Sequence, residues 1–187
     1  MSREIRIDGD AIISGAISVI ERDGYAAVTA RSVATELGIS TQPIYREFGD
    51  MRGLKAAALD RGWKIFTEYV AGEAEEQAAK YVMFAVERKN MFNFLFRDRN
   101  VAYSGLDDMA HKLVEGTDII DRLTVITGLE RDKVYRLHLF VWMALHGLAS
   151  MSADNDVSFG SNDMTEIKKF AVDMTRAVSM YLREVGV

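Results

Sequence analysis

Residues 40–48, with the sequence Ser-Thr-Gln-Pro-Ile-Tyr-Arg-Glu-Phe, form the stretch that decides the fold of this chain. Ile44 and Phe48 lie one helical turn apart, so a helix here buries both of them against a core. The other positions are mostly polar and are left on the outer face. The stretch therefore predicts a short helix that presents a polar surface.

The preceding segment, from Thr29 to Leu37, is predicted to be another helix. Val33, Ala34 and Leu37 recur at spacings of one, three and four residues, which places them on one side. Thr29 is a suitable N-cap, and Gly38 suits the left-handed conformation that ends a helix. The turn Gly38-Ile39-Ser40 then joins the two helices, which is the layout of a helix-turn-helix.

Two starting points are open for the later helix. Pro43 favours a start at its own position, because proline suits the first helical residue and restricts Gln42 before it. Ser40 as N-cap favours a start three residues earlier, where Pro43 costs no hydrogen bond because the first four N–H groups lack partners. We expect Ser40 to be the cap, and either start exposes the same residues.

The exposed residues of this helix are suited to binding DNA. They are Thr41, Gln42, Pro43, Tyr45 and Arg46. Gln and Arg side chains pair with base edges in the major groove, and Tyr and Thr hydroxyls bind phosphates. The helix therefore predicts an interface with double-stranded DNA.

From Ala11 to Leu54 the chain resembles the DNA-binding domain of the TetR/AcrR family of transcriptional regulators. The resemblance rests on several elements at fixed offsets: Ala11-Ile12-Ile13, Gly24-Tyr25, Val28-Thr29, Val33-Ala34, Leu37-Gly38-Ile39-Ser40, Ile44-Tyr45, Phe48 and Leu54. The chain departs from the family at two positions. The family often has His or Tyr where Glu47 stands and usually a phosphate-contacting Lys where Met51 stands, and the nearest substitutes are Arg46, Arg52 and Lys55. 

The resemblance and the exposed face together give a set of candidate DNA-binding residues. They are Thr29, Arg31, Ser40, Thr41, Gln42, Pro43, Tyr45, Arg46, Arg52 and Lys55. The DNA-binding domain is expected to span residues 1–54, and the remaining residues, 55–187, are expected to form a larger effector-binding and dimerisation domain.

The composition limits the other possibilities. The chain has 187 residues, 49% of them hydrophobic, which is enough for a sizeable core. It has no cysteine, no signal peptide pattern and no uncharged apolar run long enough to span a bilayer, so we expect a soluble cytoplasmic protein without a membrane partner. The net charge is −5, and the residues up to Lys55 carry seven bases and eight acids, so attraction to DNA depends on local placement of charge.

The pattern elsewhere is helical throughout, and we predict an all-α fold. Asp8 or Asp10 caps a first helix that ends at Gly24 and turns Ile13, Ala16, Ile17 and Ile20 inward. Asp50 caps a fourth helix. Further helices are expected near residues 81–86, 91–96, 106–127, 129–151 and 164–185.

The helix expected at 129–151 is apolar on two faces. One face carries Tyr135, Leu139, Trp142, His146 and Ala149, and the other carries Leu137, Val141, Leu145 and Leu148. A helix with two apolar faces packs against a different neighbour on each face. The fragment Trp142 to Ala149 is similar to a Trp-xxx-His-Gly pattern in one branch of the family. The resemblance implies that the last two helices pair with those of a second subunit as a four-helix bundle, and that the helices before them enclose an effector cavity.

A cavity of this kind is expected to bind a small, largely apolar effector, because methionine and phenylalanine are abundant between Tyr81 and Trp142. The candidate ligand-binding residues are Phe84, Met91, Phe96, Tyr103, Met109, Leu123, Trp142 and His146. Plain core packing is the alternative for each of them, and a satisfied core histidine is the alternative for His146.

No catalytic, metal or cofactor site is predicted. His138 and His146 are eight residues apart, whereas two histidines that share a metal on one helix face lie three or four apart. No phosphate-binding glycine loop and no Gly-x-Ser-x-Gly motif occurs. An all-helical enzyme would need histidines and carboxylates that cluster only in the folded chain.

The sequence thus supports a homodimeric, ligand-responsive transcriptional repressor that binds a palindromic operator and is not an enzyme. The alternative is a helical ligand-binding or protein-interaction module with a vestigial helix-turn-helix, which Glu47, Met51 and the acidic balance favour.

Overall fold

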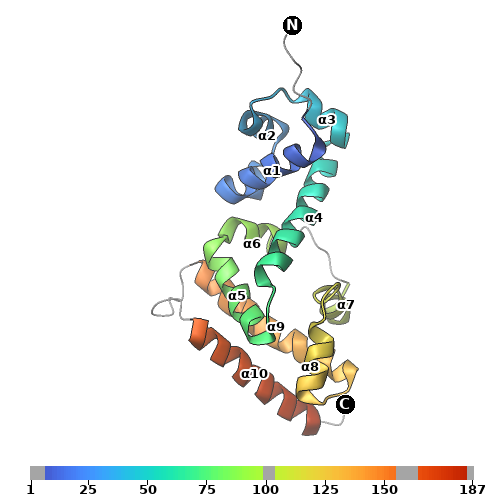
Figure 1. Ribbon diagram of the computed structural model, residues 1–187, viewed down its shortest axis with the longest axis vertical. Coiled ribbons are helices and arrows are strands. Elements are labelled where there is room, and N and C mark those ends of the chain that lie inside the picture. The colour runs from blue at the N-terminus through green and yellow to red at the C-terminus, as the bar shows by residue number, and fades with distance from the viewer. Residues whose placement is uncertain (1–6, 99–103, 155–163, 185–187) are drawn as a thin grey trace. The chain divides into compact units, whose positions relative to one another are not determined.

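The computed structural model describes residues 7–98, 104–154 and 164–184, apart from the side chains of Ala74, Glu75, Met109 and Lys112. Over these residues the protein is all-helical, as predicted (Figure 1). Its elements are α1 (Gly9–Asp23), η1 (Tyr25–Ala27), α2 (Ala30–Leu37), α3 (Gln42–Phe48), α4 (Met51–Val70), α5 (Ala74–Glu87), α6 (Lys89–Phe96), α7 (Leu106–Lys112), α8 (Ile119–Thr127), α9 (Arg131–Ala153) and α10 (Met164–Glu184). None of the described helices has the length and apolar character that crossing a membrane requires.

The chain divides into two compact units. Unit 1 comprises Met1–Glu68 and Arg88–Val101, and unit 2 comprises Tyr69–Glu87 and Ala102–Val187. This division follows packing, and it differs from the functional boundary expected at residues 54 and 55. Most of α4 and the whole of α6 pack within unit 1, because Gly62 of α4 lets Met91, Phe94 and Leu95 of α6 approach its backbone.

Helix α1 is the centre of unit 1. It buries Ile12, Ala16, Ile17, Val19 and Ile20, and Ile13, which was expected to face inward, is only half-buried because Ile12 takes the core position. Gly15 faces Leu37 of α2 so closely that a side chain at position 15 would meet the Leu37 carbons at 2.8–3.0 Å. A larger residue at position 15 would therefore require the Leu37 side chain to shift.

Single capping residues mark where the helices of unit 1 begin or end, as the sequence predicts. The Asp8 carboxylate accepts a hydrogen bond from the N–H of Ala11 at 2.8 Å, and the Thr29 hydroxyl accepts one from the N–H of Ser32 at 3.0 Å. Gly38 adopts φ 65° and ψ 34° and ends α2. Asp50 caps α4 by accepting hydrogen bonds from the N–H groups of Arg52 at 2.8 Å and Gly53 at 3.0 Å.

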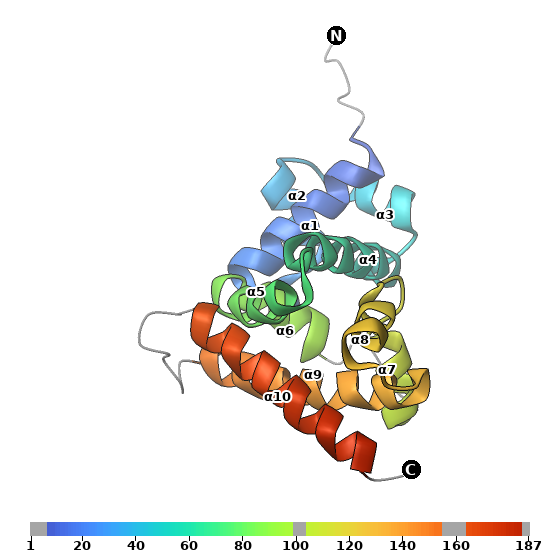
Figure 2. The same ribbon diagram turned by 60° about the horizontal axis from the view of Figure 1, so that its bottom comes forward.

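Unit 2 is built on α5, α9 and α10, which lie side by side in Figures 1 and 2, with α7 and α8 packed on α9. The sequence predicted one helix from Leu106 to Thr127, and this prediction was wrong. The structure has two helices there, α7 and α8, because Gly116 adopts φ 74° in the turn between them. Gly128, with φ 65°, ends α8 as expected.

Candidate nucleic-acid interface

The helix-turn-helix consists of α2, a turn at Gly38 to Thr41, and α3. Helix α3 begins at Gln42, and the carbonyl of Thr41 accepts the first backbone bonds, from Ile44 at 3.2 Å and Tyr45 at 3.4 Å. The expected N-cap at Ser40 is therefore wrong. Pro43, three residues after Ser40, has no N–H and so cannot donate to a capping side chain at Ser40 as the third helical residue commonly does.

Helix α3 presents a polar surface and is held by one buried residue. Ile44 is fully buried, whereas Phe48 is only half-buried. Gln42, Tyr45 and Arg46 are exposed, and the Tyr45 side chain is 48% exposed although it is aromatic. The predicted set thus projects from the unit, with Ser40 also exposed and with Thr41 and Pro43 half-buried at the helix start.

The cations of unit 1 divide into two groups. Arg31 and Arg46 are exposed, and the structure shows no ion pair or hydrogen bond from either side chain to the described residues. Arg52 is paired with the Asp50 carboxylate at 2.8 Å, and the Lys55 ammonium lies 4.5 Å from the centre of the Tyr25 ring. Of the four predicted cations, Arg31 and Arg46 are therefore the two whose side chains interact with no other side chain among the described residues.

Two carboxylates are also placed by the fold. The hydrogen bond from the N–H of Gly53, followed by that from the Arg52 side chain, lowers the pKa of Asp50. Glu47 lies against Gly9 at the start of α1, since a side chain at position 9 would meet the Glu47 carboxylate oxygen at 3.1 Å. A carboxylate is favourable at a helix N-terminus, so Glu47 has a structural partner where a DNA-contacting residue was expected from the resemblance.

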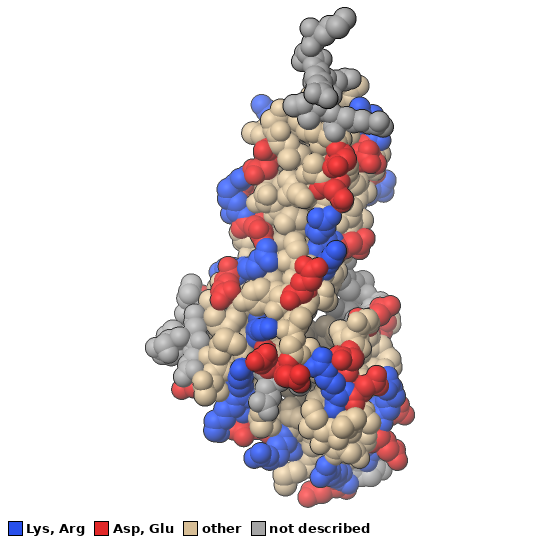
Figure 3. Space-filling model, in the orientation of Figure 1, with Lys and Arg blue, Asp and Glu red and all other residues tan. Residues whose placement is uncertain are grey.

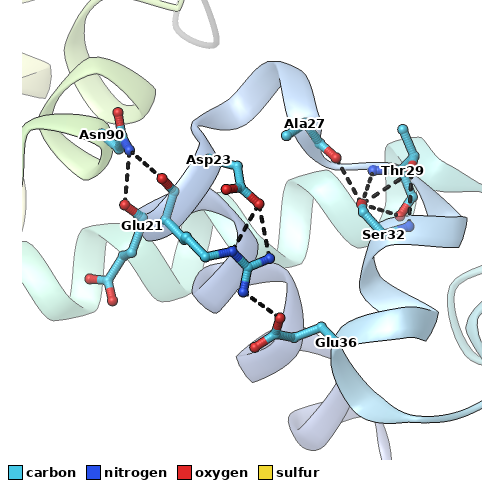
Figure 4. Close-up of polar contacts among 8 residues, drawn as sticks. Glu21, Asp23, Ala27, Thr29, Ser32, Glu36 and Asn90 are labelled. Carbon is cyan, nitrogen blue, oxygen red and sulfur yellow. Dashed lines mark hydrogen bonds and ion pairs between the residues drawn. The ribbon is translucent and has the colours of Figure 1, made fainter.

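The surface of unit 1 is not uniformly basic. On the face in Figure 3, acidic and basic side chains are interspersed. Arg22 is one of the bases that are paired with acids: its guanidinium binds Asp23 at 2.9 Å and Glu36 of α2 at 2.6 Å (Figure 4). These two carboxylates raise the pKa of Arg22, chiefly through the hydrogen bond to Asp23.

The candidate ligand-binding residues of unit 2 include one polar cluster. The Tyr81 hydroxyl lies 2.7 Å from Nδ1 of His146, and the Trp142 ring stacks on His146 with centroids 4.8 Å apart. Tyr81 is buried and comes from α5, whereas the other two come from α9. Tyr81 was not among the predicted ligand-binding residues, because a hydrogen bond across 65 positions leaves no local pattern in the sequence.

The other ligand candidates are dispersed. Phe84 is fully buried beside the Tyr69 ring, at 5.2 Å, and Leu123 belongs to a core cluster with Val134 and Leu137. Met91 and Phe96 lie on α6 and pack within unit 1. Tyr103 and the Met109 side chain lie outside the described residues. The structure therefore brings together Trp142 and His146 and places Met91 and Phe96 in the other unit.

Comparison with known proteins identifies the N-terminal part. Residues 12–58 match the family model described as bacterial regulatory proteins, tetR family. A curated protein of Mycobacterium tuberculosis, described as the uncharacterized HTH-type transcriptional regulator Rv0681, is 22% identical over 158 residues, which cover 79% of this chain and 71% of that protein. Residues 12–58 of this chain are therefore similar to the DNA-binding region of the tetR family.

Two solved structures show the same fold over nearly the whole chain. A TetR-like transcriptional regulator from Rhodococcus sp. RHA1 is 14% identical, with a TM-score of 0.58, over 92% of this chain and 96% of that one. A protein of unknown function from the same organism is 15% identical, with a TM-score of 0.63, over 97% and 99%. The fold of these two structures therefore extends over both units of this chain, and the family model covers all ten candidate DNA-binding residues.

Proposed function

We propose that this protein is a ligand-responsive transcriptional repressor that binds a palindromic operator as a homodimer. The observation that carries the proposal is the exposed set Gln42, Tyr45 and Arg46 on α3, held by fully buried Ile44. Gln42 and Arg46 have the donors and acceptors that base edges require. Tyr45, Thr41 and Arg31 are suited to the phosphates on either side.

The proposed homodimer is supported by the exposed apolar surface of α9 and α10. On α9, Phe140, Met143 and Met151 follow one face, and on α10 Phe170, Met180 and Tyr181 are exposed. Exposed apolar side chains that recur along two packed helices are typical of interaction sites. Gly147 lies on the same face of α9 with no atom within 4 Å of where a side chain would begin. A glycine costs stability in mid-helix, so its presence here favours close approach of a second helix.

The proposed effector site is centred on Tyr81, Trp142 and His146. A hydroxyl, an imidazole and an indole beside an apolar core suit a small molecule that is mostly apolar and carries one polar group. An effector that binds one arrangement of the dimer more tightly weakens DNA binding by that difference in affinity, because it changes the separation of the two α3 helices. Half-sites about 34 Å apart are required for both to enter the major groove. We place this activity in the cytoplasm, where the operator lies.

A second candidate function is a helical ligand-binding or protein-interaction module whose helix-turn-helix no longer binds DNA. The position of Glu47 against α1 and the acidic balance of the chain favour it. Such a protein would select no duplex from a random library and would not shift the DNA upstream of its own gene.

The DNA proposal is tested by Gln42→Ala and Tyr45→Ala. Selection from a random duplex library gives the preferred sequence of the unchanged protein, and fluorescence anisotropy measures the affinity of each variant for it. We expect Tyr45→Ala to weaken binding to all duplexes by about tenfold and Gln42→Ala to reduce mainly the preference for one base pair, by about tenfold. Lys64→Ala, which removes an exposed cation of α4, is the control and should change affinity less than twofold. Unchanged affinity and base preference in both α3 variants would contradict the assignment.

A further inference from the structure

A row of three ring side chains runs along one face of α9. His138, Trp142 and His146 follow one another at intervals of four residues, and side chains four residues apart lie on the same face of a helix. Trp142 stacks on His146, and Nδ1 of His146 lies 2.7 Å from the hydroxyl oxygen of Tyr81 on α5. The proposed effector site at Tyr81, Trp142 and His146 therefore continues along α9 to His138.

His138 lacks a hydrogen bond that the other two histidines have. Nδ1 of His111 lies 2.7 Å from the carbonyl oxygen of Asp107, and Nδ1 of His146 has the Tyr81 hydroxyl. Nδ1 of His138 is buried and has no hydrogen-bond partner among the residues that the structure describes. Buried polar atoms nearly always have a partner, and leaving one without it is costly. His138 therefore needs a partner from outside these residues.

The helical segments that form this row carry no charged side chains. From Leu137 to Ala153, α9 has no Asp, Glu, Lys or Arg, and residues 81–86 of α5, which packs on α9, have none either. Burial lowers the pKa of His138 to about 4, so its imidazole is neutral at neutral pH. A charged ligand would lose hydration here without gaining an opposite charge from these segments, which is costly. The row therefore favours an uncharged molecule.

A hydroxyl is the uncharged group that suits His138 best. Nδ1 of a neutral imidazole donates a hydrogen bond in one tautomer and accepts one in the other. A hydroxyl does both, so it satisfies Nδ1 in either tautomer, whereas a carbonyl only accepts. Trp142 comes one turn later, about 6 Å along the helix axis, and its half-buried indole leaves apolar surface that a ring can cover. A ligand with a hydroxyl on a ring can therefore contact both side chains at once.

We propose that the effector is an uncharged alcohol or phenol, whose hydroxyl bonds to Nδ1 of His138 and whose ring packs on Trp142. This inference rests on the proposed function and names the chemical class of ligand for its effector site. It also adds His138, eight residues before His146, to the residues that bind the effector. A buried water would satisfy Nδ1 too, and it is the result that the experiment has to exclude.

The first experiment uses probes that share one biphenyl frame. They are para-phenylphenol, biphenyl, para-phenylbenzoate and para-phenylbenzylamine, which carry a hydroxyl, no polar group, a carboxylate and an ammonium, respectively. Equilibrium dialysis at neutral pH measures the Kd of each probe for the full chain. We expect para-phenylphenol to bind about tenfold more tightly than biphenyl, and each charged probe to bind at least about tenfold more weakly than para-phenylphenol.

The second experiment removes the polar atom of His138. His138→Phe should fold, because it replaces a buried polar atom that has no partner among the described residues. We expect it to weaken the binding of para-phenylphenol about tenfold and to leave that of biphenyl within about twofold. His138→Gln, which keeps a donor and an acceptor, should retain part of the preference for the hydroxyl. His111→Phe is the matched control, since His111 is exposed and already has the Asp107 carbonyl as a partner, and it should bind both probes as the unchanged protein does.

Nuclear magnetic resonance locates the bound probe. The chain has two tryptophans, Trp63 in α4 and Trp142, so Trp63→Phe leaves only the indole N–H signal of Trp142 in the spectrum. Bound para-phenylphenol should shift this signal and the imidazole signals of His138, which are assigned by their loss in His138→Phe. The signals of His111, assigned in the same way, should not shift.

The proposal is overturned if a charged probe binds as tightly as para-phenylphenol, if His138→Phe weakens para-phenylphenol and biphenyl equally or not at all, or if binding leaves the Trp142 signal unshifted. It is also overturned if no probe binds, because a buried water alone then satisfies His138. If His138→Phe does not fold, the probe series in the unchanged protein and in His138→Gln still decides. Para-phenylphenol that binds as expected but leaves the affinity for the preferred duplex unchanged would instead contradict the ligand response in the proposed function.

Discussion

Unit 1 exposes one large apolar side chain among the described residues, Tyr45, whereas unit 2 exposes ten, seven of them on α9 and α10. The two units also differ in their buried polar side-chain atoms. Three described side-chain atoms are buried without a hydrogen-bond partner, on His138, Ser152 and Ser179, and all three belong to α9 or α10. Unit 1 has a surface suited to water and to a polyanion, while the outer face of unit 2 is suited to another protein surface.

Under the proposed function, this difference corresponds to separate tasks for the two units. A single exposed aromatic residue among polar groups is useful for binding DNA and carries little risk of self-association. Apolar side chains repeated along two packed helices gain stability only when they are covered. The proposed dimer would cover them, and each α3 would then be presented by an assembly that unit 1 does not form by itself.

The largest effect is expected when charge is placed on the apolar face of unit 2, which tests whether this face forms the dimer. Met143→Glu combined with Met180→Glu puts carboxylates on α9 and α10 at sites that are 47% and 56% exposed. We expect the dimer dissociation constant to rise about 1,000-fold, because burying unpaired carboxylates is costly. Analytical ultracentrifugation measures the dimer, and operator affinity should fall with it.

The control for this prediction is Val125→Glu with Ile126→Glu. These two apolar residues of α8 are 85% and 66% exposed, so the added charge and the lost apolar area are similar. The control should remain dimeric. Equal dissociation of both double variants, or of neither, would contradict the assignment of α9 and α10 as the interface.

A second test concerns the buried histidine of unit 2. Burial lowers the pKa of His138 from 6.5 to about 4, so between these pH values the unfolded chain binds a proton that the folded chain does not. The contribution of neutral His138 to the free energy of unfolding is fully present above pH 6.5. It is lost as the pH falls to 4, and the total loss is up to about 3 kcal/mol. Urea unfolding at several pH values measures the loss.

His138→Phe should remove this part of the pH dependence while His111→Phe should leave it, since His111 is exposed. The same pH slope in His138→Phe and in the unchanged protein would show that another group is responsible. Because unit 1 has no histidine, the two units should differ in acid sensitivity, which hydrogen exchange at pH 5 can resolve by region.

The two units also differ in how far the sequence predicts them. In unit 1, Asp8, Thr29, Gly38 and Asp50 mark helix ends correctly, because capping depends on residues within one turn. The misplaced start of α3 has a local cause as well, which is the missing N–H of Pro43. The exposed polar face of α3 follows directly from helical periodicity around Ile44.

The remaining features depend on residues that are far apart in the chain. The bond between Asn90 and Glu21 spans 69 positions, and that between Tyr81 and His146 spans 65. A helix was predicted near residues 91–96, but the contacts with Gly62 of α4 and with Tyr25, which are distant in the sequence, show which unit buries it. Likewise, two apolar faces were predicted for α9, and the exposed stripe of Phe140, Met143 and Met151 lies on neither.

The smallest expected effect tests whether local capping determines where the helices of unit 1 begin. Thr29→Ala removes the hydroxyl that accepts from Ser32, whose own hydroxyl accepts from the N–H of Thr29 at 2.9 Å (Figure 4). We expect the free energy of unfolding to fall by about 1 kcal/mol. Thr29→Ser keeps the acceptor and should lose less than half as much. Thr35→Ala, at an exposed site in the middle of α2, should be neutral or slightly stabilising because alanine favours helix. A loss in Thr35→Ala as large as in Thr29→Ala would mean that burial and packing, as in unit 2, determine where this helix begins.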